Sequence, residues 1–134
     1  MRKWIIIIMG FFVVFVVGGY LLLNNEEGKR REIEIVQEYQ DIKHPEGARM
    51  LHYELNRKIL IRWIHSRYSY SINDSEVAKY YENQLLSKGW HQISYSLPPG
   101  KVGYLYAKDN LELALTLNKN GYWIISMHYS DVDY

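Results

Sequence analysis

Residues Trp4 to Leu23 contain no charged and no amide side chain, and this run constrains the chain more than any other feature of the sequence. A helix of this length, at about 1.5 Å per residue, covers the roughly 30 Å hydrocarbon core of a bilayer. The mean hydropathy of the whole chain is only -0.31, so the other residues have the composition of a soluble domain. The sequence therefore predicts a short cytoplasmic tail (residues 1–3), a transmembrane anchor in the lipid bilayer (residues 4–23) and a domain after it.

The length of the apolar run favours a retained anchor, with a cleaved signal peptide as the alternative. It exceeds the roughly 7 to 15 apolar residues of a signal peptide, and no Ala-x-Ala-like site follows it. Arg2 and Lys3 on one side face Lys29, Arg30 and Arg31 on the other, so the count of flanking charges is close to a tie. A first apolar helix after a short basic tail generally leaves its N-terminus in the cytoplasm. We therefore expect a single-pass protein of the cell membrane with an extracytoplasmic domain.

The part of the chain after the anchor is nearly neutral and contains no cysteine. Without Arg2 and Lys3, the 16 basic residues fall to 14, against 15 acidic residues. This balance argues against a nucleic-acid partner, which would favour a basic surface. The absence of cysteine excludes disulfides, a thiolate nucleophile and thiolate metal sites. About 110 residues suffice for one compact domain and not for two.

Residues 24–43 are predicted to form a juxtamembrane stalk that is partly helical. Ile33, Val36 and Tyr39 recur at helical spacing among charged residues, and the segment His44-Pro45-Glu46-Gly47 ends the pattern. We expect a solvated spacer here, followed by a globular domain over residues 44–134.

Turn chemistry predicts a four-stranded meander at the C-terminal end of the domain. Gly121 in the loop Lys119-Asn120-Gly121 can take the left-handed position of a three-residue hairpin loop. Two-residue and four-residue turns at Asp109-Asn110 and at 98–101 extend the register backward. The resulting pairs share one apolar face: Leu117/Trp123, Leu115/Ile125, Leu113/Met127, Leu111/Tyr129, Tyr106/Leu113, Tyr104/Leu115, Val102/Leu117, Leu97/Val102, Tyr95/Tyr104 and Ile93/Tyr106.

One helix and one further hairpin complete the predicted fold. Asn73 is a predicted N-cap with Glu76 at the third helical position, and Gly89 marks the C-terminal stop. A loop over 56–58 would form a hairpin with one apolar face, pairing Leu55/Ile59, Tyr53/Ile61 and Leu51/Trp63. The sequence thus predicts an α+β fold: an N-terminal transmembrane helix, then a two-layer domain of antiparallel sheet with one packed helix, in the order β-β-α-β-β-β-β.

Two stretches resemble those of small bacterial membrane-anchored or secreted domains of uncharacterised function. They are His44-Pro45-Glu46-Gly47-Ala48 and the segment from Ser75-Glu76-Val77-Ala78-Lys79-Tyr80-Tyr81 through Leu85 to Gly89-Trp90. The resemblance covers about residues 44 to 134. It implies a bacterial extracytoplasmic setting, and because the motif is structural it carries over no catalytic residue.

No constellation of residues in the sequence predicts a metal site or a cofactor. The strand registers assign the five histidines to different faces, with His52 on the face opposite to His65, and no His-x-x-x-His pair occurs. A Gly-x-Ser-x-Gly elbow, a Walker loop and a Gly-x-Gly-x-x-Gly turn are also absent from the sequence.

One candidate surface site follows from the registers, on the sheet face away from the helix. Gln92, Glu112 and His128 are predicted to lie there in one row together with Ala107. The simplest interpretation is a solvated face with an exposed Glu–His pair. The alternative is a shallow surface where a partner strand, a loop or a small ligand rests.

These observations predict a tethered binding or accessory interaction module of the bacterial envelope, with an unidentified protein partner and no enzymatic activity. An immunity-type inhibitor of a secreted toxin is one specific form of this prediction. The other alternative is a hydrolytic enzyme that uses Glu112 and His128 as an acid–base pair.

Overall fold

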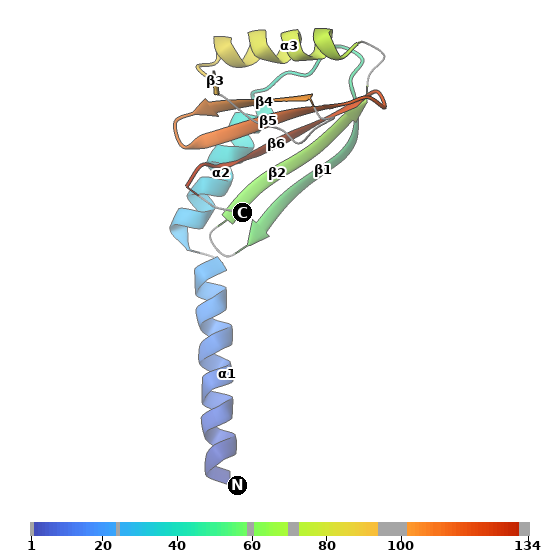
Figure 1. Ribbon diagram of the computed structural model, residues 1–134. Coiled ribbons are helices and arrows are strands. Elements are labelled where there is room, and N and C mark those ends of the chain that lie inside the picture. Colours follow the sequence, from blue (N-terminus) through green and yellow to red (C-terminus); the bar gives the residue numbers. More distant parts are fainter. Residues whose placement is uncertain (1, 24, 59–60, 70–72, 94–101, 132–134) are drawn as a thin grey trace.

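The computed structural model describes residues 2–23, 25–58, 61–69, 73–93 and 102–131. The described residues form three helices and six strands (Figure 1). In chain order these are α1 (Arg2–Leu23), α2 (Glu26–Gln40), β1 (Arg49–Lys58), β2 (Ile61–Ser69), α3 (Asp74–Ser87), β3 (His91–Ile93), β4 (Val102–Lys108), β5 (Leu111–Asn118) and β6 (Tyr122–Tyr129).

The strands form one antiparallel sheet in the spatial order β1-β2-β6-β5-β4-β3 (Figure 1). The α+β class is therefore confirmed. The predicted arrangement is incomplete in two respects. The first hairpin joins the meander through β2 and β6, which turn chemistry between neighbouring strands cannot reveal. A further helix, α2, precedes β1 and belongs to the domain.

The predicted register of β4, β5 and β6 is confirmed at every pair. Leu117 lies opposite Trp123 and Val102 lies opposite Leu117. Gly121 has a φ of 79° in the loop between β5 and β6, which is the left-handed conformation that favours glycine there. The Asp109-Asn110 turn is also confirmed, since Lys108 pairs with Leu111 directly before and after it.

The predicted register of the first hairpin is wrong. Strand β1 continues through residues 56–58, which were expected to form the loop, and Lys58 pairs with Ile61. The actual partners are Leu55 with Ile64 and Tyr53 with Ser66. This register buries Ile64 and leaves Trp63 on the opposite face. The predicted partner Ile59 lies outside the described residues.

Strand β3 is also shifted by one position from the prediction. Ile93 pairs with Leu105, and Gln92 takes the place opposite Tyr106. A register slip of one residue moves every side chain to the other face of a sheet. The predicted turn over 98–101, with its partners Tyr95 and Leu97, lies outside the described residues.

Helix α3 has the predicted start and end. The side chain of Asn73 accepts a hydrogen bond from the backbone N–H of Glu76 at 2.9 Å, which is the N-cap geometry. Gly89 has a φ of 84° just after the helix, and the N–H of Trp90 donates to the carbonyl oxygen of Leu85. The side chains that α3 buries against the sheet are Val77, Tyr81 and Leu85.

Helix α2 packs on the same sheet face as α3, so the prediction of a single packed helix is wrong. Ile35 is fully buried and Tyr39 is 5% exposed, both within the same core cluster as the α3 residues. Two ion pairs also connect α2 to the sheet, Glu38 with Lys108 at 2.9 Å and Glu32 with Arg62 at 3.1 Å. The segment expected to be a solvated spacer therefore forms part of the domain core.

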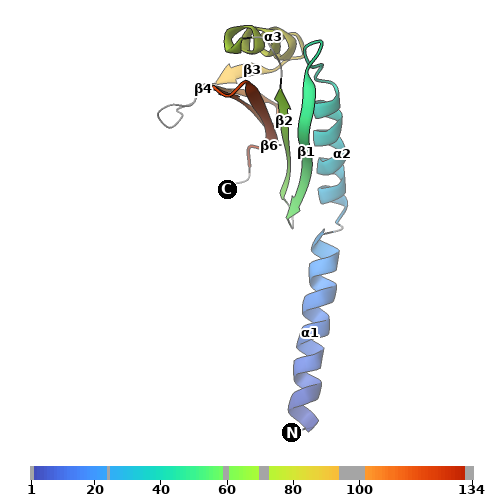
Figure 2. The same ribbon diagram turned by 90° about the vertical axis from the view of Figure 1, so that its right-hand side faces the viewer.

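Helix α1 is apolar and makes no buried contact, and it is long enough to span a membrane. It extends away from the domain at the end where α2 begins (Figures 1 and 2). It ends at Leu23 and α2 begins at Glu26, so only two residues join them. Two residues span at most about 10 Å, which fixes the start of α2 close to the end of α1.

Candidate functional site

The sheet has one face covered by α2 and α3 and a second face, here called the open face, on its other side (Figure 2). The open face carries the side chains that alternate with the core residues of β5 and β6, all of them half-buried. Glu112 of β5 pairs directly with His128 of β6, and the two side chains meet at 3.3 Å between Oε2 and Nε2. The structure therefore brings these two candidate residues together.

The third candidate, Gln92, does not join the row. It lies opposite Tyr106, whose side chain is buried on the helix-covered face. His91 takes the expected place of Gln92, because His91 pairs with Ala107 and Ala107 pairs with Glu112. The shift of β3 by one position explains this difference.

Trp63 also lies on the open face, although the sequence pattern predicts it on the core face. It pairs with His128 on one side and with Asn56 on the other. With the side-chain amide of Asn56 turned over, its oxygen accepts from the Trp63 indole N–H at 3.1 Å and its nitrogen donates to Glu54 at 2.8 Å. The predicted hairpin register had placed Trp63 among the core residues.

The alternation of β2 gives little information that could have placed Trp63 correctly. Apolar side chains occur at both parities of this strand, Ile64 at one and Trp63 at the other. The parity that faces the core also holds Arg62 and Ser66, which are among the most buried polar residues. Arg62 donates to Glu32 of α2 and to the carbonyl oxygen of Ile61 in its own strand, and the contact with α2 cannot be seen from the strand alone.

Four of the five histidines share the open face, so their predicted separation is wrong. The rings of His52 and His65 lie 6.4 Å apart, and His65 Nδ1 is 3.0 Å from the hydroxyl of Ser126. His128 and His91 lie in the row of Glu112. Among the described residues, no group of three or more histidine, aspartate or glutamate side chains could hold a metal ion.

The electrostatics of the open face favour neutral imidazoles at His65 and His128 near neutral pH. Burial lowers the pKa of His128, although the nearby Glu112 carboxylate acts in the opposite direction. Burial and the neighbouring His52 also lower the pKa of His65. A neutral imidazole can accept or donate a hydrogen bond, so this row offers both polarities beside the indole ring of Trp63.

A second polar cluster lies inside the core, around His44. His44 Nδ1 is 2.8 Å from the hydroxyl of Tyr81, and Nε2 is 2.9 Å from the hydroxyl of Tyr68. Trp123 donates its indole N–H to Tyr81 at 3.0 Å, and the hydroxyl of Tyr39 meets that of Tyr68 at 2.5 Å. Each of these hydrogen bonds has one donor and one acceptor if His44 is neutral, with Nδ1 accepting from Tyr81 and Nε2 donating to Tyr68.

The pKa shifts assign the His44 cluster a structural role. Burial raises the pKa of Tyr39, Tyr68 and Tyr81 and lowers the pKa of His44, so every member is held in its neutral form. A tyrosinate nucleophile would need the opposite shift. The cluster instead connects α2, α3 and the loop that contains His44 to the sheet.

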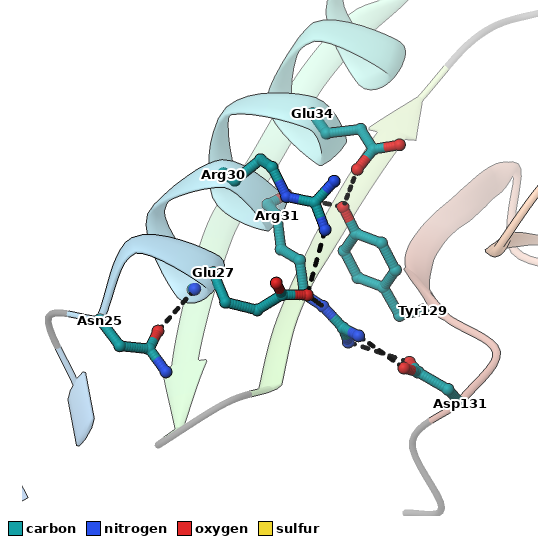
Figure 3. Close-up of polar contacts among 8 residues, drawn as sticks. Asn25, Glu27, Arg30, Arg31, Glu34, Tyr129 and Asp131 are labelled. Atoms are coloured by element: carbon teal, nitrogen blue, oxygen red, sulfur yellow. Dashed lines mark hydrogen bonds and ion pairs between the residues drawn. The ribbon is translucent and has the colours of Figure 1, made fainter.

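A third cluster of hydrogen bonds and ion pairs connects the start of α2 to the end of β6 (Figure 3). Arg31 donates two hydrogen bonds to Asp131, at 3.0 and 2.6 Å, and one to Glu27 at 3.0 Å. Its guanidinium lies 4.7 Å from the ring centroid of Tyr129, and the Tyr129 hydroxyl donates to Glu34 at 2.8 Å. The Arg31 contact lowers the pKa of Asp131, so this carboxylate stays charged over a wide pH range.

Comparisons with known proteins gave no relative for this chain. No protein-family model, no curated protein and no solved structure matches it.

Proposed function

We propose that this chain is a single-pass membrane protein whose domain, outside the cytoplasm, is a binding or accessory module of the bacterial envelope. The apolar, solvent-exposed surface of α1 supports the anchor, because such a surface is stable only in lipid or against other apolar partners. The bacterial, extracytoplasmic setting rests on the sequence resemblance and on the short basic N-terminal tail.

The composition of the open face supports the proposal that this module binds a partner. It combines the indole of Trp63, the Glu112–His128 pair and small residues such as Ala114 on paired strands of one sheet. Aromatic and polar side chains that are already ordered lose little conformational entropy when a partner docks. A surface of this composition suits the recognition of a protein loop or strand.

Photo-crosslinking in cells tests this proposal. We would place a photoreactive amino acid at Thr116 or Ala114 of the open face, and at Lys79 or Glu82 of α3 as matched controls. Discrete crosslinked products from the open-face positions, absent from the α3 positions, are the expected result. Equal crosslinking from both surfaces, or none from the open face, would contradict the proposal.

An immunity-type inhibitor of a secreted toxin is a specific form of this function. In that case the open-face crosslink would join the chain to the toxin, and the substitution Trp63→Ala would abolish protection of the cell. Matched protection by the wild type and this variant would argue against the inhibitor.

The enzyme alternative is supported by one observation, the 3.3 Å contact between Glu112 and His128. A carboxylate beside an imidazole can orient it and stabilise its protonated form during proton transfer. If the pair acts chemically, Glu112→Gln should abolish the activity of the protein in cells, such as protection from a toxin, while the crosslinks from Thr116 persist. If the pair only contributes to binding, the activity in cells and the crosslinks should weaken together.

A further inference from the structure

The end of the domain at which α1 leaves carries an excess of positive charge. Three structural segments meet there: the first turns of α2, the adjoining ends of β1 and β2, and the end of β6 (Figures 1 and 2). Their cations are Lys29, Arg30, Arg31, Arg57, Lys58 and Arg62, and their carboxylates are Glu26, Glu27, Glu32, Glu34 and Asp131. This end therefore has one more positive than negative charge among the described residues.

Internal ion pairs account for most of these charges. Arg31 binds Asp131, and Arg57 and Arg62 both contact Glu32, whereas Arg30 pairs with Glu27 at the surface. Lys29 and Lys58 are exposed. They are the cations of this end for which the described residues supply no carboxylate partner.

The bilayer that holds α1 is the nearest surface to these two lysines. Only two residues separate α1 from α2, so the first turn of α2 lies at the level of the lipid headgroups when α1 spans the membrane. Because ion pairs and buried side chains fix α2 to the sheet, the end of β1 with Lys58 is held at a similar level. The long lysine side chains can extend to the headgroups from there.

We propose that this end of the domain, through Lys29 and Lys58, docks on anionic phospholipid headgroups of the bilayer that contains α1. The docking fixes the tilt of the domain on the membrane, which the two-residue junction alone leaves free. It rests on the proposed membrane anchor and is independent of any partner on the open face. Each lysine gains from the negative surface potential of the leaflet, an interaction that weakens with increasing salt.

The test uses the full isotope-labelled chain in lipid nanodiscs that contain a gadolinium-chelating lipid, which broadens amide signals near the headgroups. The amide of Gly28 lies near the bilayer through chain connectivity alone and is the internal positive control. The amide of Arg57 reports docking. In discs with about 30% phosphatidylglycerol, we expect its broadening to exceed that in pure phosphatidylcholine by about twofold or more.

Charge reversal gives the matched comparison. Lys29→Glu combined with Lys58→Glu should remove the extra broadening at Arg57, whereas Lys79→Glu combined with Lys119→Glu makes the same change in net charge far from this end and should keep it. Equal broadening at Arg57 in both lipid compositions, or its persistence in the Lys29/Lys58 variant, would overturn the proposal. Absence of broadening at Gly28 itself would instead overturn the membrane anchor.

Discussion

Trp123 and His128 occupy the same strand, β6, but face opposite sides of the sheet. Trp123 is 2% exposed, stacks on Tyr68 and donates a hydrogen bond to Tyr81. Trp123→Ala should therefore lower the free energy of unfolding by about 3 to 5 kcal/mol, through the cavity and the lost hydrogen bond. His128→Ala should lower it by less than about 1 kcal/mol, because its partner Glu112 is reachable by water.

Urea denaturation of both variants checks this prediction. A large loss for His128→Ala together with a small loss for Trp123→Ala would mean that the two faces of the sheet are exchanged.

His44 gives the fold a dependence on pH. Burial lowers its pKa below the usual 6.5, so the unfolded chain binds protons more readily than the folded chain. The contribution of His44 to stability is therefore complete above pH of about 6.5 and is lost as the pH falls through the lowered pKa. His65 and His128 have shifts of the same sign. We expect the free energy of unfolding to decrease as the pH falls from about 6.5 to about 5.

The variant His44→Gln separates this contribution from the others. It should lower stability at neutral pH by about 1 to 3 kcal/mol and should flatten the decrease below pH of about 6.5. His91→Gln, at an exposed position of β3, is the matched control and should keep the wild-type slope. An unchanged slope in His44→Gln would show that His44 takes up its proton equally in both states.

At the scale of elements, α2 shows a contrast between two isoleucines two residues apart. Ile35 is fully buried against the sheet and Ile33 is 59% exposed. Ile35→Ala should lower the free energy of unfolding by about 2 to 5 kcal/mol, whereas Ile33→Ala should change it by about 0.5 kcal/mol or less. Thermal melts of both variants measure the difference. Small losses of stability in both variants would support the solvated spacer that the sequence predicts for this segment.

The elements that the sequence predicts well are those that end in a distinctive residue. Gly121 determines the loop between β5 and β6, and from it the parity of β5 and β6 follows. Asn73 and Gly89 define both ends of α3 in the same way. The Glu112–His128 contact was predictable for this reason, since it depends only on the register of one hairpin.

The parts that the sequence does not reveal depend on contacts between distant segments. The connection of β1 to β2 carries no turn signal, and the polar residues Arg62 and Ser66 face the core, so β2 gives no clear alternation. Trp63 and the shared face of the histidines depend on that register. The burial of α2 depends on partners such as Lys108 that lie far along the chain.

For the whole molecule, the core includes residues that come before the predicted domain boundary. Ile35, Tyr39 and Ile42 are each 5% exposed or less. The fragment 24–134 should therefore unfold cooperatively and remain monomeric, whereas the fragment 44–134 leaves an apolar sheet face without its helix and should aggregate. Size-exclusion chromatography and thermal melts of both fragments check this. Cooperative unfolding of 44–134 would show that α2 is dispensable.

The proposed topology is tested with a reporter attached to the C-terminus. Alkaline phosphatase fused after Tyr134 should be active, because this enzyme folds only after export from the cytoplasm. The same reporter fused after Lys3 should be inactive, since this position comes before the apolar run Trp4 to Leu23. Activity of a cytoplasmic reporter after Tyr134 would place the domain on the other side of the membrane.

The two-residue junction between α1 and α2 also limits where an encounter can happen. A domain of about 100 residues has a radius of gyration of roughly 13 Å. Because no spacer separates the domain from α1, it can contact only molecules that lie within about its own diameter of the junction. If α1 anchors the chain in a bilayer as proposed, the search for a partner is confined to a thin layer along that bilayer and proceeds by lateral diffusion. We then expect a partner that is embedded in the same membrane or reaches its surface, and not a target held further out.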